Sequence, residues 1–525
     1  MRLTSIAILT SLIACSKNQD TENQKPSAGA TTKAGDPAAP PSGETTVKKE
    51  VVKKTVDKTP LPALEADTGG ATGKPLWSIG FGGLGIDSPR DLALAKTGDI
   101  YVAGYFDAEM TVGGKTFTPT PPKPNKDPKQ KTVATSDAYL VKLSADGKVQ
   151  WTKTWGAARD EDAKAVAVNG DLVAVAGNFL DELVLEDKSH QAVNSDDIYV
   201  AAFTADGKLA WMWTAGGIDS DGANAIAAAP DGGWYVGGSF RKVSSFDQTK
   251  TEYKSKGGTD AFLAKLSKTG DLEWVKTFGG AYDDTILHLA VDERGNVYVQ
   301  GHFKDKSDWG GGELVAGGGS DNDVVLAKYD VNGDHVWSKR FGNAFNDVAG
   351  GLAVDRAGNI TMVGSFDKSV SFADGDDHRS NGEADIFIAR FDPSGKLDWA
   401  KTYGSDREDV GWGVAADAAG NTVMTGWFQN TVNFGKTTLG SIKSKGNKDV
   451  FAIKHDAKGN VVWLQTWGDK DHDQGRAVAL DDKGHAVIAG IYRFALSVTS
   501  PAIESVRAPD DRIPKPDTFV VKLDR

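Results

Sequence analysis

A tryptophan recurs at nearly regular intervals along most of this chain, and this repetition limits the possible folds more than any other sequence feature. The intervals are 60 to 74 residues long. A near-constant period with several matched positions is the signature of a repeat protein, in which each repeat packs against its neighbours. The seven tryptophans are Trp77, Trp151, Trp211, Trp274, Trp337, Trp399 and Trp463.

The residues that follow each tryptophan have a pattern typical of short strands. Sixteen positions after each tryptophan stands an alanine with apolar neighbours, and a glycine-bearing turn comes next. Short alternating apolar segments between turns indicate half-buried strands. The small residue predicts the crowded strand nearest to a central axis. The alanines are Ala93, Ala167, Ala227, Ala290, Ala353, Ala415 and Ala479.

Each repeat continues with three more predicted strands. The second strand ends in Gly-x-Phe or Gly-x-Tyr, a variable loop follows, and the fourth strand holds the tryptophan. The third strand opens with an aspartate in every repeat: Asp137, Asp197, Asp260, Asp323, Asp385, Asp449 and Asp517. Four short antiparallel strands, repeated seven times, predict an all-β fold, a seven-bladed β-propeller of four-stranded blades.

The two ends of the repeat region predict how the ring is completed. Residues Leu76–Phe81 match a fourth strand, whereas Thr518–Leu523 match a third strand. We therefore predict that the N-terminal strand completes the last blade and closes the propeller. Closure in this way would remove the exposed strand edge that an open ring presents.

A family resemblance follows from these motifs. The pattern Ala-x-Asp-x-x-Gly-Asn-x-Tyr-x-x-Gly-x-Phe, then Asp-Ala-Phe-x-Ala-Lys and Gly-x-x-x-Trp, resembles the SBBP repeat of bacterial seven-bladed propellers. The match covers roughly residues 76–525 and is clearest from Asp260 to Phe428. The resemblance implies a propeller in a secreted or surface protein and implies no defined chemistry.

The first fifteen residues have the pattern of a secretory signal. Arg2 precedes a short apolar stretch, Ile6–Ala14, which is too short for a stable membrane span. Its end, Leu-Ile-Ala-Cys, resembles the lipobox of bacterial lipoproteins, and Cys15 is the one cysteine of the chain. The resemblance implies acylation of Cys15 and cleavage just before it, with lipid as the membrane anchor.

Composition divides the remainder of the chain into a linker and a folded domain. Residues 16–74 contain no aromatic residue and are rich in Pro, Thr, Ala, Gly, Lys and Glu. Such a segment buries too little apolar surface to offset the entropy lost on ordering. We expect a signal peptide at 1–14, a lipidated cysteine with a disordered tether at 15–74, and the propeller at 75–525.

Charge and localisation signals narrow the class of partner. The formal net charge is −12, so we expect no nucleic-acid binding. The lipobox resemblance implies attachment to the cell envelope. By resemblance to enteric lipoproteins, Ser16 after Cys15 favours the outer membrane, with the domain in the periplasm or at the surface. A closed propeller needs no second copy, so we expect a monomer.

A second repeated acid stands ten positions after each tryptophan. The set is Asp87, Glu161, Asp221, Asp284, Asp347, Asp409 and Asp473. An acid in every repeat indicates a structural role, in which carboxylates accept backbone N–H bonds in turns. Calcium is the alternative in one repeat, where Asp469, Asp471 and Asp473 alternate before Gly475, although the pattern lacks the terminal Glu of an EF-hand. We expect no other cofactor.

One position near the start of the inner strand differs among the repeats. Thirteen residues after the tryptophan, three consecutive repeats of a closed ring carry Arg476, Arg90 and Lys164, and another carries Trp412. These residues are candidate ligand contacts at a mouth of the central channel, with the cations forming a basic arc for an anion. The alternative is that the cations pair with the repeated acids Asp473, Asp87 and Glu161, and that Trp412 only packs between blades.

These features favour a noncatalytic binding or scaffold module for an envelope protein or a surface polysaccharide. Loops and the channel mouth would carry the specificity. The alternative is a carbohydrate-active or other hydrolytic enzyme with its site at the same mouth. A localised carboxylate pair in the mouth would favour the enzyme. The sequence favours binding over catalysis and selects no catalytic residue.

Overall fold

The computed structural model describes residues 72–122, 135–157, 159–247, 251–319, 321–435, 440–506 and 512–525. All of these residues belong to one compact unit. These ranges contain strands and turns and no helix, which confirms the all-β prediction. Cys15 and the predicted tether up to residue 71 lie outside the described residues.

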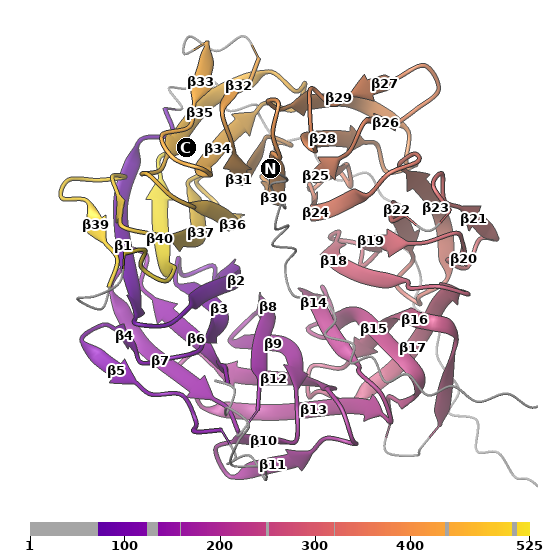
Figure 1. Ribbon diagram of the computed structural model, residues 1–525. Coiled ribbons are helices and arrows are strands. Elements are labelled where there is room, and N and C mark those ends of the chain that lie inside the picture. The colour runs from indigo at the N-terminus through magenta and orange to yellow at the C-terminus, as the bar shows by residue number, and fades with distance from the viewer. Residues whose placement is uncertain are drawn as a thin grey trace, which may run out of the picture. The chain divides into compact units, whose positions relative to one another are not determined.

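Most strands of the described residues fall into seven antiparallel repeats of four, each named here by its number along the ring (Figure 1). Repeat 1 contains β2 (Asp87–Leu94), β3 (Ile100–Phe106), β6 (Asp137–Leu143) and β7 (Val149–Trp155). Repeat 2 contains β8 (Glu161–Asn169), β9 (Leu172–Phe179), β12 (Asp197–Thr204) and β13 (Leu209–Gly217). Repeat 3 contains β14 (Gly222–Ala228), β15 (Trp234–Ser245), β16 (Glu252–Leu266) and β17 (Leu272–Gly280).

The second half of the chain continues the same order. Repeat 4 contains β18 (Thr285–Val291), β19 (Val297–Phe303), β22 (Asp323–Tyr329) and β23 (His335–Phe341). Repeat 5 contains β24 (Asp347–Val354), β25 (Ile360–Phe366), β28 (Asp385–Phe391) and β29 (Leu397–Tyr403). Repeat 6 contains β30 (Val410–Ala416), β31 (Thr422–Phe428), β34 (Asp449–His455) and β35 (Val461–Trp467).

Repeat 7 is assembled from both ends of the described chain. It contains β36 (Gln474–Leu480), β37 (Ala486–Tyr492), β40 (Asp517–Leu523) and β1 (Pro75–Gly83). The N-terminal β1 pairs with the C-terminal β40 in antiparallel register, from Trp77 opposite Lys522 to Phe81 opposite Thr518. The pairing predicted for these two segments is therefore confirmed.

The contacts beyond β1 and β40 replace the turn that joins these strand positions in the other repeats. The Thr72 N–H donates to the Arg525 carbonyl at 3.1 Å, and the Asp524 N–H donates to the Lys74 carbonyl at 2.8 Å. Gly73 adopts a φ of 62° and lies so close to Trp463 that an added Cβ would come within 2.6 Å of its ring. Only glycine fits this position.

Short hairpins occupy the variable loops between the second and third strands. They are β4/β5 (Met110–Val112, Lys115–Phe117), β10/β11 (Glu182–Leu185, Lys188–Gln191), β20/β21 (Lys306–Asp308, Glu313–Val315), β26/β27 (Ser369–Ser371, Asp377–Arg379), β32/β33 (Thr431–Asn433, Ser441–Lys443) and β38/β39 (Ala495–Leu496, Ile503–Glu504). In repeat 3 the long β15 and β16 extend into this region, and the far end of β15 pairs with β13.

The hydrophobic core lies between neighbouring repeats. Seven clusters of buried side chains occur among the described residues, one at each junction between repeats. The cluster that joins repeats 7 and 1 contains Phe81 and Val520 from one and Val102 from the other. The middle strands are packed on both faces, so β6 and β40 are buried throughout, whereas β7 is partly exposed.

The first strand of each repeat lies nearest to the centre (Figure 1). Neighbouring inner strands contact one another from β2 through β8, β14, β18, β24 and β30 to β36, and β36 contacts β2. All seven repeated alanines lie on these inner strands, as the sequence predicts. A small side chain at this position lets seven strands converge on one axis.

The repeated tryptophans join neighbouring repeats at the end of the strands where each inner strand finishes. Trp151 of β7 donates its indole N–H to the Ala205 carbonyl in a turn of repeat 2 at 3.1 Å. In the same turn Gly207 adopts a φ of 83°, and an added Cβ would come within 3.3 Å of Trp151. The tryptophan packs against the turn that contains the glycine, and a larger residue in place of the glycine would crowd the indole ring. The two residues therefore recur together in the sequence.

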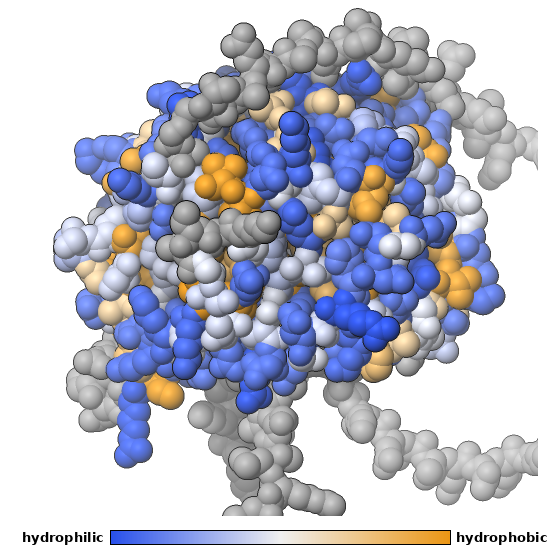
Figure 2. Space-filling model, turned by 90° about the horizontal axis from the view of Figure 1, so that it is seen from above, coloured by the Kyte–Doolittle hydropathy of each residue, from blue (hydrophilic) through white to orange (hydrophobic). Residues whose placement is uncertain are grey.

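One face of the domain is mainly polar (Figure 2). Figure 2 also shows that hydrophobic residues form small separate patches among hydrophilic ones on this face. Among the described residues, no helix is long and apolar enough to cross a membrane.

Candidate functional site

The repeated acids join adjacent repeats at the opposite end, where the inner strands begin. The backbone N–H of Asp347 donates to the Asn322 carbonyl of the preceding repeat at 2.9 Å. Its side-chain Oδ2 accepts the Asn343 N–H at 3.1 Å. All seven acids are buried, and each accepts at least one backbone N–H. These contacts agree with the structural role predicted for the set.

Each of these acids also faces the aspartate that opens a third strand. The seven pairs are Asp87–Asp517, Glu161–Asp137, Asp221–Asp197, Asp284–Asp260, Asp347–Asp323, Asp409–Asp385 and Asp473–Asp449. Burial, and then the neighbouring carboxylate of Asp517, raise the pKa of Asp87 to about 8. Because a pair occurs at every junction, these raised pKa values mark the fold and not one reactive site.

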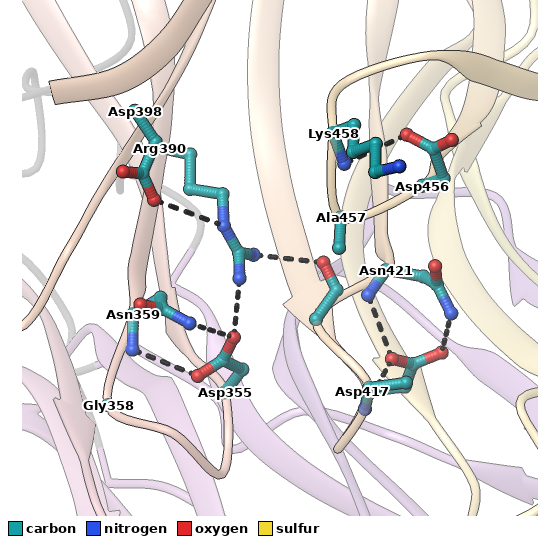
Figure 3. Close-up of polar contacts among 12 residues, drawn as sticks. Asp355, Gly358, Asn359, Arg390, Asp398, Asp417, Asn421, Asp456, Ala457 and Lys458 are labelled. Atoms are coloured by element: carbon teal, nitrogen blue, oxygen red, sulfur yellow. Dashed lines mark hydrogen bonds and ion pairs between the residues drawn. The ribbon is translucent and has the colours of Figure 1, made fainter. Parts of the chain in front are cut away.

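Charged side chains at the end where the inner strands finish also form contacts that hold turns together (Figure 3). The buried Arg390 guanidinium lies 2.6 Å from Asp355 Oδ2 and donates to the Gly420 carbonyl of the next repeat at 2.9 Å. Asn359 donates its side-chain N–H to the same Asp355 oxygen at 2.8 Å. These contacts hold turns together, so this cation is not available to a ligand.

The structure brings all four predicted ligand contacts to one cavity at the centre of the ring. The cavity has a volume of about 150 Å³. Arg476, Arg90 and Lys164 enter it from the consecutive inner strands β36, β2 and β8, and Trp412 enters from β30 beside Arg476. Its other walls include Asp91, Asn224, Leu287, His288, Gly350, Gly351 and Leu352. We call this cavity the channel mouth.

The cations of the channel mouth have different partners from those the sequence suggested. Arg90 forms an ion pair with Asp162 of the next repeat, with Nη2 and Oδ2 2.8 Å apart. Lys164 Nζ donates to Asn224 Oδ1 at 3.3 Å. The pairing expected with Asp87, Glu161 and Asp473 is wrong, because those acids are buried at the junctions described above.

Arg476 is the least satisfied of the three cations. Its Nη2 donates to Gln474 Oε1 at 3.0 Å, and its buried Nε has no hydrogen-bond partner among the described residues. Burial, and then the neighbouring charge of Arg90, lower the pKa of Arg476 to about 10, so it stays protonated at neutral pH. Burial likewise lowers the pKa of Lys164.

An aromatic pair forms the wall beside Arg476. The Arg476 guanidinium carbon lies 5.7 Å from the centre of the Trp412 ring. Trp412 lies against Trp427, with ring centres 5.4 Å apart, and Lys448 Nζ lies 4.6 Å from the Trp427 ring centre. Trp427 is buried, whereas Trp412 lines the channel mouth. Trp412 therefore contacts both the packing between repeats and the cavity.

The three residues of the predicted calcium loop do not converge. Asp473 accepts the backbone N–H groups of Asp469 and Arg493 at 2.9 and 3.0 Å. Asp471 lies 3.6 Å from Arg493 Nη1 and from His472 Nε2. Nowhere in the described part of the chain do three His, Cys, Asp or Glu side chains gather as a metal-binding group.

A second cavity, of about 420 Å³, lies beside the β26/β27 hairpin. Arg340, Asn343, Phe345, His378 and Arg379 are among its lining residues. Arg340 is paired with Asp323 at 2.8 Å. The repeat pattern does not indicate this cavity, because several of its lining residues belong to the β26/β27 hairpin, in a loop whose sequence varies between repeats.

Comparison with known sequences gives distant relatives, and no family model matches the chain. The chain is 21% identical over 504 residues to an uncharacterized WD repeat-containing protein of Acanthamoeba polyphaga mimivirus, covering 80% of this chain and 36% of that protein. It is 28% identical over 278 residues to the regulatory protein FlaEY of Caulobacter vibrioides, covering 51% of this chain and 27% of that protein. The chain thus spans about a quarter to a third of the length of these relatives.

Comparison with solved structures gives equally distant likenesses. The WD40 domain of Neurospora crassa Pan2 aligns with 84% of this chain and 89% of its own, at 8% identity and a TM-score of 0.39. Sqt1 from Chaetomium thermophilum aligns with 87% of this chain and 100% of its own, at 9% identity and a TM-score of 0.39. The strand order and the WD-repeat relative together identify the chain as a repeat protein of the β-propeller type.

Proposed function

We propose that residues 75–525 form a closed seven-bladed β-propeller of the SBBP type that acts as a noncatalytic binding module. The pairing of β1 with β40 supports closure, and so does the hydrophobic cluster shared by repeats 7 and 1. A WD-repeat relative supports a role in binding, because propellers of this kind present rigid surfaces to partners.

One observation carries the proposed binding role. Three cations and a tryptophan meet at one cavity from a matched position that holds Asn, Leu or Gly in the other three repeats. Two of those cations have no ion-pair partner among the described residues. Residues that build the fold recur in every repeat, whereas these residues do not. Asp91 also lines the channel mouth, but its two carboxylate oxygens already accept backbone N–H groups. Asp162, beside the lining, is paired with Arg90.

We further propose that acylated Cys15 anchors the protein to the cell envelope, in the outer membrane, with residues 16–74 as the tether. The signal-like segment and its terminal Leu-Ile-Ala-Cys support this anchor. The partner is then an envelope protein or a surface polysaccharide within reach of the tethered domain.

Affinity capture from an envelope extract tests the binding role. The bait is the full-length chain purified in detergent, beside a variant with Arg90→Glu, Lys164→Glu and Arg476→Glu. Circular dichroism and thermal unfolding must first show that the variant is folded. We expect a specific partner that the variant loses. A partner retained by the variant moves the site away from the channel mouth, and no partner with either bait contradicts the binding role.

A further inference from the structure

The channel mouth has more positive than negative charge. Of the residues that line it, Arg90, Lys164 and Arg476 are positive and Asp91 is negative. Asp162, which is paired with Arg90, adds a second negative charge beside the lining. Burial lowers the pKa of His288, which also lines the cavity, to about 4, so its imidazole is neutral at pH 7. With the ion-paired Asp162 counted, the charged groups at and beside the cavity therefore sum to +1. A monoanion neutralises this charge, whereas a dianion would leave an uncompensated charge in a confined site.

The hydrogen-bond donors that remain available to a ligand lie on the Arg476 side of the channel mouth. Arg90 is held by Asp162 through both carboxylate oxygens, at 3.2 and 3.0 Å from its Nε. Arg476, in contrast, offers a buried Nε and a guanidinium edge with one neutral partner, the Gln474 side chain. A planar guanidinium with free N–H groups matches the two oxygens of a carboxylate. Lys164, on the other side of Arg90, adds positive potential.

The remaining walls suit an apolar or flat body attached to that carboxylate. Trp412 presents its ring beside Arg476 and is held in place by Trp427. Across the cavity, Leu287 and Leu352 supply apolar surface, and Gly350 supplies backbone without a side chain. A bare inorganic ion would leave these surfaces unused. A volume of about 150 Å³ admits a small molecule or one terminal group and excludes a folded chain.

We propose that the channel mouth binds a small organic monocarboxylate. Arg476 donates to the carboxylate, Lys164 contributes charge, and the ring of Trp412 packs against the body of the ligand. This inference rests on the proposed function, because it specifies the chemistry of the same site. Both a free aromatic acid and a sugar acid share this chemistry, whether the sugar acid is free or terminal on a polymer.

The first experiment compares pairs of ligands of similar shape, of which one is negatively charged and the other is neutral. Isothermal titration calorimetry with the full-length chain in detergent compares benzoate with benzamide, and glucuronate with glucose. Each pair differs mainly in the negative charge. Acetate and inorganic phosphate are added as anions without an apolar body. We expect at least one carboxylate to bind about tenfold or more tightly than its neutral analogue, and more tightly than acetate and phosphate.

The two pairs also distinguish the sources of the ligand. Preference for benzoate identifies an aromatic acid, and preference for glucuronate identifies a sugar acid. Equal binding of the charged and neutral members overturns the inference. So does phosphate binding tighter than either carboxylate, or an absence of binding at millimolar concentrations.

Variants then locate the site. Arg476→Gln should weaken carboxylate binding about ten- to hundredfold, because a charge-assisted hydrogen bond is lost. The control is Lys208→Gln, which removes the same charge from a side chain that is 78% exposed in a turn at the other end of the strands. It should leave the affinity unchanged. An unchanged affinity in Arg476→Gln overturns the inference.

A variant that is expected to bind the carboxylate more tightly provides a further test, because misfolding cannot produce a gain of affinity. Asp162→Asn removes the acidic partner of Arg90 and raises the net charge of the channel mouth, so it should tighten carboxylate binding several-fold. Weaker binding in a folded Asp162→Asn variant contradicts the inference. If the capture experiment succeeds while no carboxylate binds, the binding module stands and the ligand chemistry proposed here fails. If a carboxylate binds while no partner is captured, the macromolecular role fails instead.

Discussion

The buried carboxylate pair Asp87–Asp517 makes the stability of this protein depend on pH in an unusual direction. Asp87 is completely buried, and its Oδ2 accepts the Gly83 N–H at 2.8 Å. Its Oδ1 has no hydrogen-bond partner among the described residues. Replacement by asparagine keeps the acceptor for Gly83 and removes the charge. The new amide also places N–H donors beside the carboxylate of Asp517.

The expected effect follows from the raised pKa of Asp87. Burial, with the nearby Asp517, raises this pKa from 3.8 to about 8. Below pH 4 both states are protonated and the free energy of unfolding is unaffected. Between pH 4 and 8 the unfolded chain loses a proton that the folded chain keeps, so stability falls as pH rises. The full cost above pH 8 is about 6 kcal/mol, an upper limit because the pair can share one proton.

Urea unfolding followed by tryptophan fluorescence measures this effect. We expect Asp87→Asn to be only slightly more stable than the natural chain near pH 5 and several kcal/mol more stable near pH 9. The control is Asp146→Asn, because Asp146 is exposed and hydrogen bonds from Lys148 and Ser144 lower its pKa. It should not reproduce the gain at high pH. Identical pH dependence in the natural chain and in Asp87→Asn would refute the reasoning.

Three other predictions test the repeat contacts and the anchor. Deleting Leu76–Phe81 removes the strand that pairs with β40 and should sharply lower the thermal unfolding temperature; an unchanged temperature contradicts the closure proposal. Trp151→Phe removes the indole N–H that bonds the Ala205 carbonyl and should cost about 1 kcal/mol in urea unfolding, and no loss would show that ring packing alone matters. Cys15→Ala should move the protein from the membrane fraction to the soluble fraction, and retention in membranes counts against lipidation.

Much of the strand order was predictable because each repeat uses local signals. Alternating apolar residues and turn glycines specify short strands wherever they occur, so the start of β6 at Asp137 and the bounds of β40 agree closely with the sequence pattern. The hairpins within the variable loops were not predicted. Their strands are only two to four residues long and their sequences vary, although five of the six hairpins begin three residues after the Gly-x-Phe or Gly-x-Tyr motif.

The grouping of the site residues was also predictable from the alignment of the repeats with one another. Arg90, Lys164, Arg476 and Trp412 occupy one matched position, and a ring carries every copy of that position to the same axis. Their partners were not predictable in this way. Arg90 reaches Asp162 of the following repeat instead of Asp87 beside it in the chain, because inner strands pack side by side across the junction.

Repetition in the sequence therefore determined the all-β class, the strand order and the position that faces the axis, because each of these follows from contacts made in the same way by every repeat. The charge balance of the channel mouth was decided by the tertiary structure alone. Whether a cation has a carboxylate partner depends on distances between different repeats. Those distances left Arg476 with one neutral partner and gave Arg90 an acidic one.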